Sequence, residues 1–222
     1  QDGAFMSSRD DILARVRANL GVAGDAASRR EAAQAAMASR RQGVRPAVAG
    51  DLAARFAAKS VAMSSSVDRV AMLAEVPAAV ARYLAKQGLP CRAVCWPEFA
   101  ALDWVGAGVE IEARAAHGDD ATGITGCFCA IAETGTLMLA SGPRTAATTS
   151  LLPETHIAIV PVSRIVPAME EGFALLRTER GEDLPRAVNF VSGPSRTGDI
   201  EQTIVLGAHG PYRVHLLLVE GV

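Results

Sequence analysis

The chain has 222 residues, half of them apolar, and a formal net charge of −2 at pH 7. A chain of this length can bury one sizeable core, which favours one domain with an extension. No apolar run reaches the ~18 residues that a membrane-spanning helix needs, so we expect no membrane span. The start of the sequence also lacks the pattern of a secretory signal, and we therefore expect a cytoplasmic protein.

Charge is unevenly distributed along the chain. Residues 1–60 contain ten Lys or Arg against six Asp or Glu, whereas the remainder contains twelve against eighteen. The basic residues form no dense stripe interleaved with aromatic residues, which argues against nucleic acid as the main partner. The basic N-terminal segment, residues 1–60, could still dock on an acidic protein partner.

The N-terminal segment is predicted to be helical. Hydroxyl caps and acidic residues at 7–11 predict the start of a helix that ends at Gly21. Ser28 followed by Glu31 could cap a second helix, and residues 51–59 have the apolar spacing of a third.

From residue 60 onward, candidate strands alternate with helices. Helices are predicted from Pro77 to Gly88 and from Pro167 to Gly181. Two of the strands are near-continuous apolar runs, as expected for strands covered on both faces. The predicted strands are 60–63, 91–96, 109–113, 124–130, 136–140, 156–160, 187–191 and 214–219. The pattern indicates an α/β domain over 60–222, a three-layer α/β/α sandwich, after a helical N-terminal extension over 1–59.

The four cysteines are Cys91, Cys95, Cys127 and Cys129. Cys127 and Cys129 alternate in a predicted strand, so their thiols can point to the same side, and a four-sulfur zinc or iron–sulfur site is one interpretation. Apolar neighbours favour the other interpretation, in which the thiols are buried as small hydrophobes. We therefore expect no metal and no cofactor.

The first polar cluster lies between two predicted buried strands, at Glu133-Thr134-Gly135-Thr136. A carboxylate in this place is costly unless it is hydrogen-bonded or faces a cleft. The threonines supply hydroxyls, and the glycine lets the backbone approach a ligand. Glu133 is therefore a candidate base, nucleophile or ligand anchor, and a simple β-turn whose glutamate bonds nearby amides is the alternative.

The second polar cluster, Ser192 to Glu201, follows a predicted strand directly. Its glycines, hydroxyls and arginine can form a concave array of backbone N–H donors that favours a carboxylate or phosphate. The Arg196 guanidinium is a matching fork donor. In the alternative, Asp199 caps a helix and Arg196 pairs with a surface acid. The candidate ligand residues of the two clusters and the following turn are Thr134, Gly135, Thr136, Gly193, Ser195, Arg196, Thr197, Asp199 and His209.

The histidines at 156 and 209 are weaker candidates, because a lone histidine at a strand edge or turn is more often structural. Ser195, His209 and Asp199 together have the residue types of a hydrolase triad. The sequence has no Gly-x-Ser-x-Gly elbow, so this interpretation ranks last.

Several segments resemble, in order and spacing, the lactate-utilisation protein C family, also known as the LUD domain. They are Glu133-Thr-Gly-Thr, Leu151-Leu-Pro, Ile157-Ala-Ile-Val-Pro161, Ile165-Val-Pro167, Ser192-Gly-Pro-Ser, Asp199-Ile-Glu201 and Val205-Leu-Gly-Ala-His-Gly-Pro211. The resemblance covers residues 120–222 closely. It implies a fold similar to ribose-phosphate isomerases and coenzyme A transferases.

The resemblance also implies membership of a three-component system that oxidises L-lactate to pyruvate, in which the other two components carry the iron–sulfur clusters. Our leading hypothesis is therefore a non-redox subunit that binds a small anion or a partner at a cleft between the two clusters. The alternative is a separate enzyme acting on a coenzyme A thioester or sugar phosphate, with Glu133 as nucleophile or base. The third hypothesis is a regulatory module that docks on a partner through its basic, helical N-terminal segment.

Overall fold

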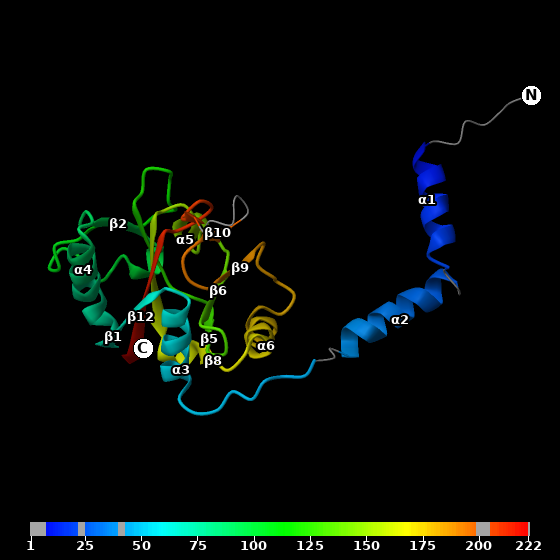
Figure 1. The fold of residues 1–222 in the computed structure, drawn as a ribbon, viewed down its shortest axis with the longest axis horizontal. Helices are drawn as coiled ribbons and strands as arrows, with labels where there is room; N and C mark the ends of the chain where they lie inside the picture. Colours follow the sequence, from blue (N-terminus) through cyan, green and yellow to red (C-terminus); the bar gives the residue numbers. More distant parts are fainter. Residues whose placement is uncertain (1–7, 22–24, 40–42, 199–204, 222) are drawn as a thin grey trace, which may run out of the picture. The chain divides into compact units, whose positions relative to one another are not determined.

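The computed structural model describes residues 8–21, 25–39, 43–198 and 205–221. The chain divides into two compact units, residues 1–46 and 47–222. The first unit contains helices α1 (Ser8–Asn19) and α2 (Ala26–Ser39), and neither helix has a buried residue (Figure 1). The cap of α2 is Asp25 rather than Ser28, because the Asp25 carboxylate accepts hydrogen bonds from the N–H groups of the first turn.

Helix α3 (Leu52–Ala62) opens the second unit. Asp51 caps it by accepting hydrogen bonds from two backbone N–H groups, and Phe56 and Ser60, four residues apart, are both buried. The strand predicted at 60–63 is therefore wrong, because Ser60 continues the buried face of this helix. The first strand of the structure begins at Ser66.

Six parallel strands form the central sheet, in the order β1-β12-β7-β4-β2-β3. Their bounds are β1 (Ser66–Met72), β2 (Arg92–Cys95), β3 (Glu110–Glu112), β4 (Thr122–Thr125), β7 (Thr155–Pro161) and β12 (Arg213–Gly221). Of the two near-continuous apolar runs, 156–160 is the inner strand β7 of this sheet, with a neighbour on each side, whereas 136–140 lies in a second sheet. This confirms the α/β class and the parallel sheet.

A second, four-stranded sheet has the order β8-β5-β6-β9. Its strands are β5 (Cys129–Ile131), β6 (Thr136–Ala140), β8 (Ile165–Val166) and β9 (Val188–Val191). The single strand predicted at 124–130 is wrong. The chain leaves the central sheet after Thr125 and enters the second sheet at Cys129, so this run supplies two strands, β4 and β5.

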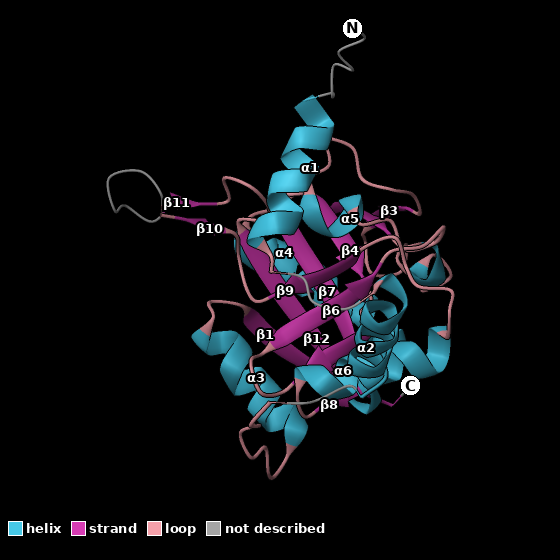
Figure 2. Cartoon of the chain, turned by 90° about the vertical axis from the view of Figure 1, so that its right-hand side faces the viewer, coloured by secondary structure: helices cyan, strands magenta, loops and turns pink. Residues whose placement is uncertain are grey.

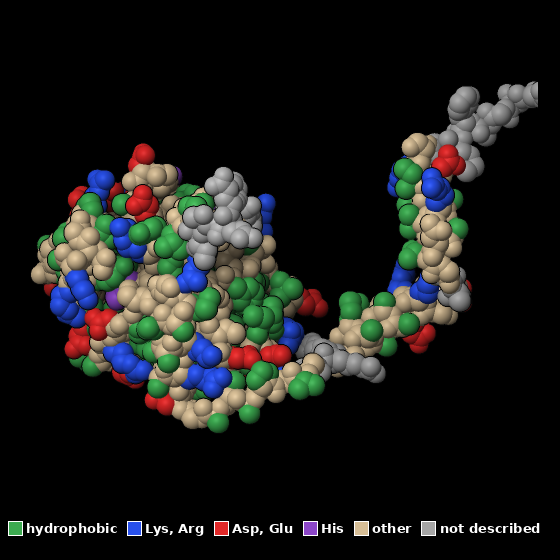
Figure 3. All heavy atoms as spheres, in the orientation of Figure 1, with side chains coloured by type: hydrophobic (Ala, Val, Ile, Leu, Met, Phe, Trp, Pro, Cys, Tyr) green, Lys and Arg blue, Asp and Glu red, His purple; other side chains and the backbone are tan. Residues whose placement is uncertain are grey.

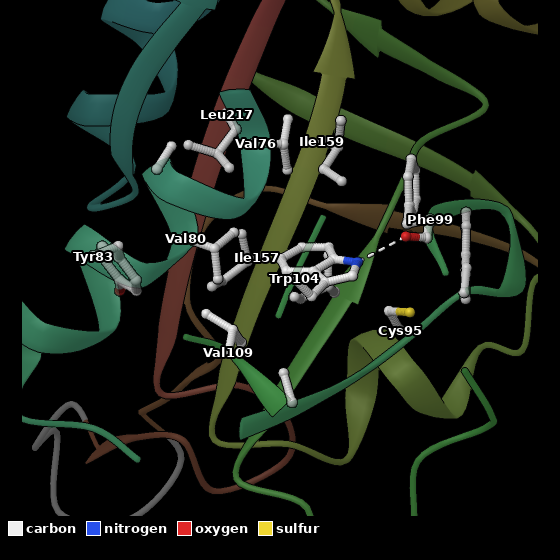
Figure 4. Close-up of a cluster of buried hydrophobic side chains, with 14 of the residues drawn as sticks. Val76, Val80, Tyr83, Cys95, Phe99, Trp104, Val109, Ile157, Ile159 and Leu217 are labelled. Atoms are coloured by element: carbon white, nitrogen blue, oxygen red, sulfur yellow. Dashed lines mark hydrogen bonds between the residues drawn. The ribbon is translucent and has the colours of Figure 1, made fainter. Parts of the chain in front are cut away.

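The two faces of the central sheet pack against different partners. On β7, Ile157 and Ile159 pack with Val80 of α4 (Val76–Gln87), as Figure 4 shows. The alternate residues of β7, Ala158 and Val160, pack instead with residues of α3 and the second sheet, which cover this face of the central sheet (Figure 2). Each large aliphatic side chain buried in this way contributes about 1.5–3 kcal/mol to folding.

The remaining elements cover the second sheet and connect the strands. Helix α6 (Met169–Arg180) packs through Leu176 on Cys129 and Met138, on the face of the second sheet that is turned away from the first. The others are α5 (Thr148–Leu151), the hairpin β10 (Arg196–Thr197) and β11 (Val205–Leu206), and the 3-10 turns Leu73–Glu75, Pro97–Phe99 and Val162–Arg164.

None of the described helices has the length and apolar character that crossing a bilayer requires. Figure 3 shows acidic and basic side chains interspersed over the visible face of the second unit.

Candidate functional site

The turn at Glu133–Thr136 connects β5 to β6 and lies against α3. Gly135 has a φ of +69°, and a Cβ on it would come within 2.5 Å of the backbone nitrogen of Ser60. The Ser60 hydroxyl donates a hydrogen bond to the Gly135 carbonyl at 3.2 Å. A glycine is therefore required by both the backbone conformation and the close approach to α3.

The loop at Ser192–Thr197 lies against the end of the same helix. Gly193 has a φ of +83°, and a Cβ there would collide with the carbonyl oxygen of Met63. The Arg196 guanidinium donates hydrogen bonds to that carbonyl, at 3.1 Å, and to the Ser64 hydroxyl. Ser64 itself has a φ of +69°, the only positive φ outside glycine among the described residues. Strained backbone of this kind is concentrated at functional sites.

A chain of hydroxyl groups connects the two segments. The Thr134 and Thr136 hydroxyl oxygens are 2.8 Å apart, and the Thr136 and Ser192 hydroxyl oxygens are 2.7 Å apart. Two motifs separated by more than fifty residues thus meet on one side of α3. We call residues 133–136 and 192–197 the loop cluster.

A pocket of about 330 Å³ adjoins the loop cluster at Pro194. It lies at the amino ends of β1 and β12 and is open between the loop, α4 and the turn that precedes β1. We call it the serine pocket, and its lining residues are Ser64, Ser65, Ser66, Tyr83, Gln87, Pro194, Tyr212, Arg213 and Val214.

Arg213 is the cationic residue of the serine pocket. Its guanidinium lies 4.9 Å from the centre of the Tyr212 ring and 3.5 Å from the Thr155 hydroxyl. It pairs with no carboxylate of the described residues. A guanidinium without an acidic partner, beside serine hydroxyls, has the donors that a carboxylate or phosphate binds.

The structure places most of the predicted site residues in the loop cluster. Glu133 is half-buried, its N–H donates to the Pro167 carbonyl, and its carboxylate takes no hydrogen bond or ion pair from the described residues. Thr197 lies in β10, paired with Val205 of β11. The helix that Asp199 would cap in the alternative interpretation lies outside the described residues.

The predicted array of free backbone N–H groups is also only partly available. The Ser195 N–H donates to the Pro211 carbonyl at 2.9 Å, so it has no capacity left for an anion. His209 is exposed, and the structure shows no hydrogen bond between it and Ser195. Asp199 lies outside the described residues.

His156 is fully buried, with its Nε2 atom 2.8 Å from the Thr125 hydroxyl. Burial lowers its pKa to about 4, so the ring is neutral at pH 7. This geometry suits a structural histidine packed between β4 and β7.

The cysteines are all free thiols. Burial raises the pKa of Cys95 and Cys129 to about 11 and that of Cys127 to about 12. In the described part of the chain, no group of three or more His, Cys, Asp or Glu side chains is arranged to hold a metal ion.

Sequence reasoning missed the serine pocket. Its residues come from the turn before β1, from α4 and from the start of β12, and only the fold brings them together. Two signals were present in the sequence. One is the run of three serines at 64–66, and the other is the polar pair Arg213 and His215 in the otherwise apolar segment that forms β12.

Comparison with known proteins identifies relatives over the C-terminal part of the chain. The family model of the LUD domain matches residues 97–219. Lactate utilization protein C 1 of Bacillus mycoides is 45% identical over 100 residues, which are 44% of this chain and 43% of that protein. Lactate utilization protein C of Bacillus licheniformis is 38% identical over 130 residues, 56% of this chain and 53% of that protein. The chain thus spans about half the length of these relatives.

A solved structure supports the same relationship. A DUF162 family protein from Deinococcus radiodurans superposes with a TM-score of 0.58 at 26% sequence identity, covering 76% of this chain and 96% of that one. The matched region contains the second sheet, β7 and most of β12, together with the whole loop cluster. Because the family model covers more than half of its residues, the chain belongs to the LUD domain family.

Proposed function

We propose that this protein is a non-redox subunit of an iron–sulfur system that oxidises L-lactate to pyruvate. Its similarity to proteins named Lactate utilization protein C supports the assignment to lactate utilisation. The resemblance to that family supplies the partners, which are two iron–sulfur subunits in the cytoplasm. In this role the chain binds a small anion and presents it, or responds to it, within the complex.

The anion binds, in this proposal, in the serine pocket beside the loop cluster. The observation that carries the proposal is the Arg213 guanidinium, which lines a pocket of about 330 Å³ without an acidic partner among the described residues. Arg213 provides a planar fork for a carboxylate or phosphate, and the serine hydroxyls provide further donors. A pocket of this volume suits a small metabolite.

The loop cluster forms the adjoining wall of this site. Glu133, with its unengaged carboxylate, and the hydroxyls of Thr134, Thr136 and Ser192 are the proposed contacts for a larger ligand or for a partner subunit. Arg196, held by Ser64 and Met63, fixes the loop against the turn that carries the pocket serines.

Thermal unfolding with a panel of anions tests the site. L-lactate, pyruvate and phosphate are each added to the wild-type chain and to Arg213→Gln. An anion at about ten times its Kd stabilises a protein by roughly 1.4 kcal/mol, which raises the Tm of a chain of this size by about 3–6 °C. We expect such a shift for at least one anion in the wild type and its loss in Arg213→Gln.

Arg177→Gln is the matched control, because Arg177 is an exposed arginine near the end of α6, outside the serine pocket and the loop cluster. It should retain the wild-type shift. A wild-type Tm that no anion moves, or an equal shift in Arg213→Gln, would contradict anion binding at this pocket.

A further inference from the structure

Ser66 and His215 form a hydrogen-bonded pair on the two neighbouring strands β1 and β12. They are directly opposite in the parallel register, and the Ser66 Oγ atom lies 2.8 Å from Nδ1 of His215. Ser66 is exposed, whereas His215 is only 4% exposed. A solvent-accessible hydroxyl thus contacts a buried imidazole at the distance expected between a nucleophile and its base.

The imidazole is held in a fixed orientation. The Tyr83 ring of α4 stacks on it, with ring centres 3.9 Å apart and planes 8° apart. The other ring nitrogen, Nε2, is buried and has no hydrogen-bond partner among the described residues. Activation of Ser66 by this ring requires the tautomer with its proton on Nε2, in which Nδ1 accepts the Ser66 proton.

The charges around the ring come from β1 and α4. Burial lowers the pKa of His215 to about 4, the Asp68 carboxylate and the Ser66 backbone oppose this shift, and Lys86 adds to it. The imidazole is therefore unprotonated at pH 7. The Asp68 charge partly offsets the cost of forming an imidazolium when the ring takes up a proton.

Ser66 lines two adjoining pockets. One is the serine pocket with Arg213, and the other, of about 390 Å³, lies between α4 and β1 and contains Lys86 together with Arg82 and its partner Asp68, 3.7 Å apart. An attacking hydroxyl at this junction can therefore meet a carbonyl carbon whose two substituents extend into the two adjoining pockets, one with Arg213 and the other with Lys86. The neighbouring serines lack this arrangement, since Ser64 is engaged by Arg196 and Ser65 is buried.

We propose that Ser66 is a nucleophile activated by His215, and that the site cleaves carboxylic esters of small anionic acids. The Ser66 oxygen bonds to the carbonyl carbon as its proton moves to Nδ1 of His215. The ester C–O bond then breaks, and the alcohol leaves with that proton. Water attacks the acyl-serine through the same base, which releases the acid and restores the Ser66 hydroxyl. This activity goes beyond anion binding and does not require lactate.

A fluorophosphonate probe tests the nucleophile directly, because serine attack on phosphorus with loss of fluoride leaves a stable adduct. We expect one adduct on the full wild-type chain, located to Ser66 by peptide mapping, and none on Ser66→Ala. Ser163→Ala, which changes an exposed serine in the 3-10 turn after β7, should label at the wild-type rate. His215→Asn should label about 100-fold more slowly, the usual contribution of a general base.

The pH dependence of the labelling rate is a second test, and it uses only the wild-type chain, so it does not depend on whether a variant folds. Because His215 is unprotonated down to about pH 4, the labelling rate should not fall between pH 7.5 and pH 5.5. A rate that drops around pH 6.5, an adduct on another serine, or no adduct at all would overturn the proposal, as would unchanged labelling in a folded His215→Asn. Anion-dependent Tm shifts would survive such a result, so the two proposals can fail separately.

Discussion

Two glycines determine how the loop cluster meets α3. Gly135 contacts the helix at Ser60 and Gly193 contacts its end at Met63, and both have positive φ angles. At these points the loops approach the backbone of α3 with no space for a side chain. The hydroxyl chain from Thr134 to Ser192 depends on this contact, because it requires both loops to lie on the same side of the helix.

The substitution Gly193→Ala tests that contact. It adds a Cβ that collides with the Met63 carbonyl oxygen and also imposes an unfavourable φ, so the loop must move. Gly50→Ala is the matched control, because Gly50 has a φ of +86° and open space around it. We expect Gly50→Ala to cost about 1 kcal/mol in urea unfolding and Gly193→Ala to cost roughly 2–4 kcal/mol. Equal costs would mean that the close approach to α3 is unimportant.

At the residue scale, the sequence indicated the loop residues as candidates but did not indicate the serine pocket. Glu133 to Thr136 and Ser192 to Thr197 are conspicuous because polar residues and glycines interrupt apolar strands. Ser66 and His215 have weaker signals, a serine run and a polar residue within an apolar strand, and both of these features are common. Their proximity follows from the parallel pairing of β1 with β12, and no local pattern specifies that pairing.

At the element scale, α3 shows where local patterns are insufficient. Residues 60–63 have the composition of a short strand, but Ser60 lies one turn after Phe56 on the buried face of a helix that Asp51 caps. The Asp51 cap and the i, i+4 spacing of Phe56 and Ser60 therefore favour a helix over a strand in this segment. The predicted extension over 1–59 includes most of α3, which packs with the second unit in the structure.

Two truncations test this boundary. Deletion of residues 1–46 removes α1 and α2, which bury no residues, so the Tm should change by less than about 2 °C. Deletion of residues 1–60 also removes Phe56, which is completely buried, together with the buried hydroxyl of Ser60. Loss of a buried aromatic side chain costs about 3–5 kcal/mol, so this variant should unfold at a much lower temperature or fail to fold. Similar melting curves for the two truncations would show that α3 is dispensable.

At the scale of the whole molecule, the alternation of strands and helices was sufficient to predict the α/β class. The two long apolar runs correctly indicated buried strands, but only 156–160 is a parallel strand of the central sheet, because 136–140 is β6 and pairs antiparallel with β5 and β9. The second sheet was not foreseen, since β5, β6 and β9 have the same apolar character as the central strands. Which strand joins which sheet depends on long-range pairing, such as Leu137 with Val191.

The two sheets together position the proposed site. The second sheet supplies the turn at Glu133 and leads into the loop at Ser192, while the central sheet supplies Ser66 and Arg213 at its amino edge. Helix α3 lies against both sets of residues. The site therefore requires the whole second unit, and residues far from it act by holding this arrangement.

Growth on L-lactate tests the proposed role of the serine pocket in lactate utilisation most directly. In a host that carries this gene, the chromosomal copy is deleted, and wild-type, Arg213→Gln or Arg177→Gln chains are returned at matched expression levels. The wild type and Arg177→Gln should restore growth with L-lactate as the carbon source, while Arg213→Gln should fail there yet grow normally on glucose. Normal growth of the deletion strain on L-lactate, or full rescue by Arg213→Gln, would contradict the proposed role of the serine pocket in lactate utilisation.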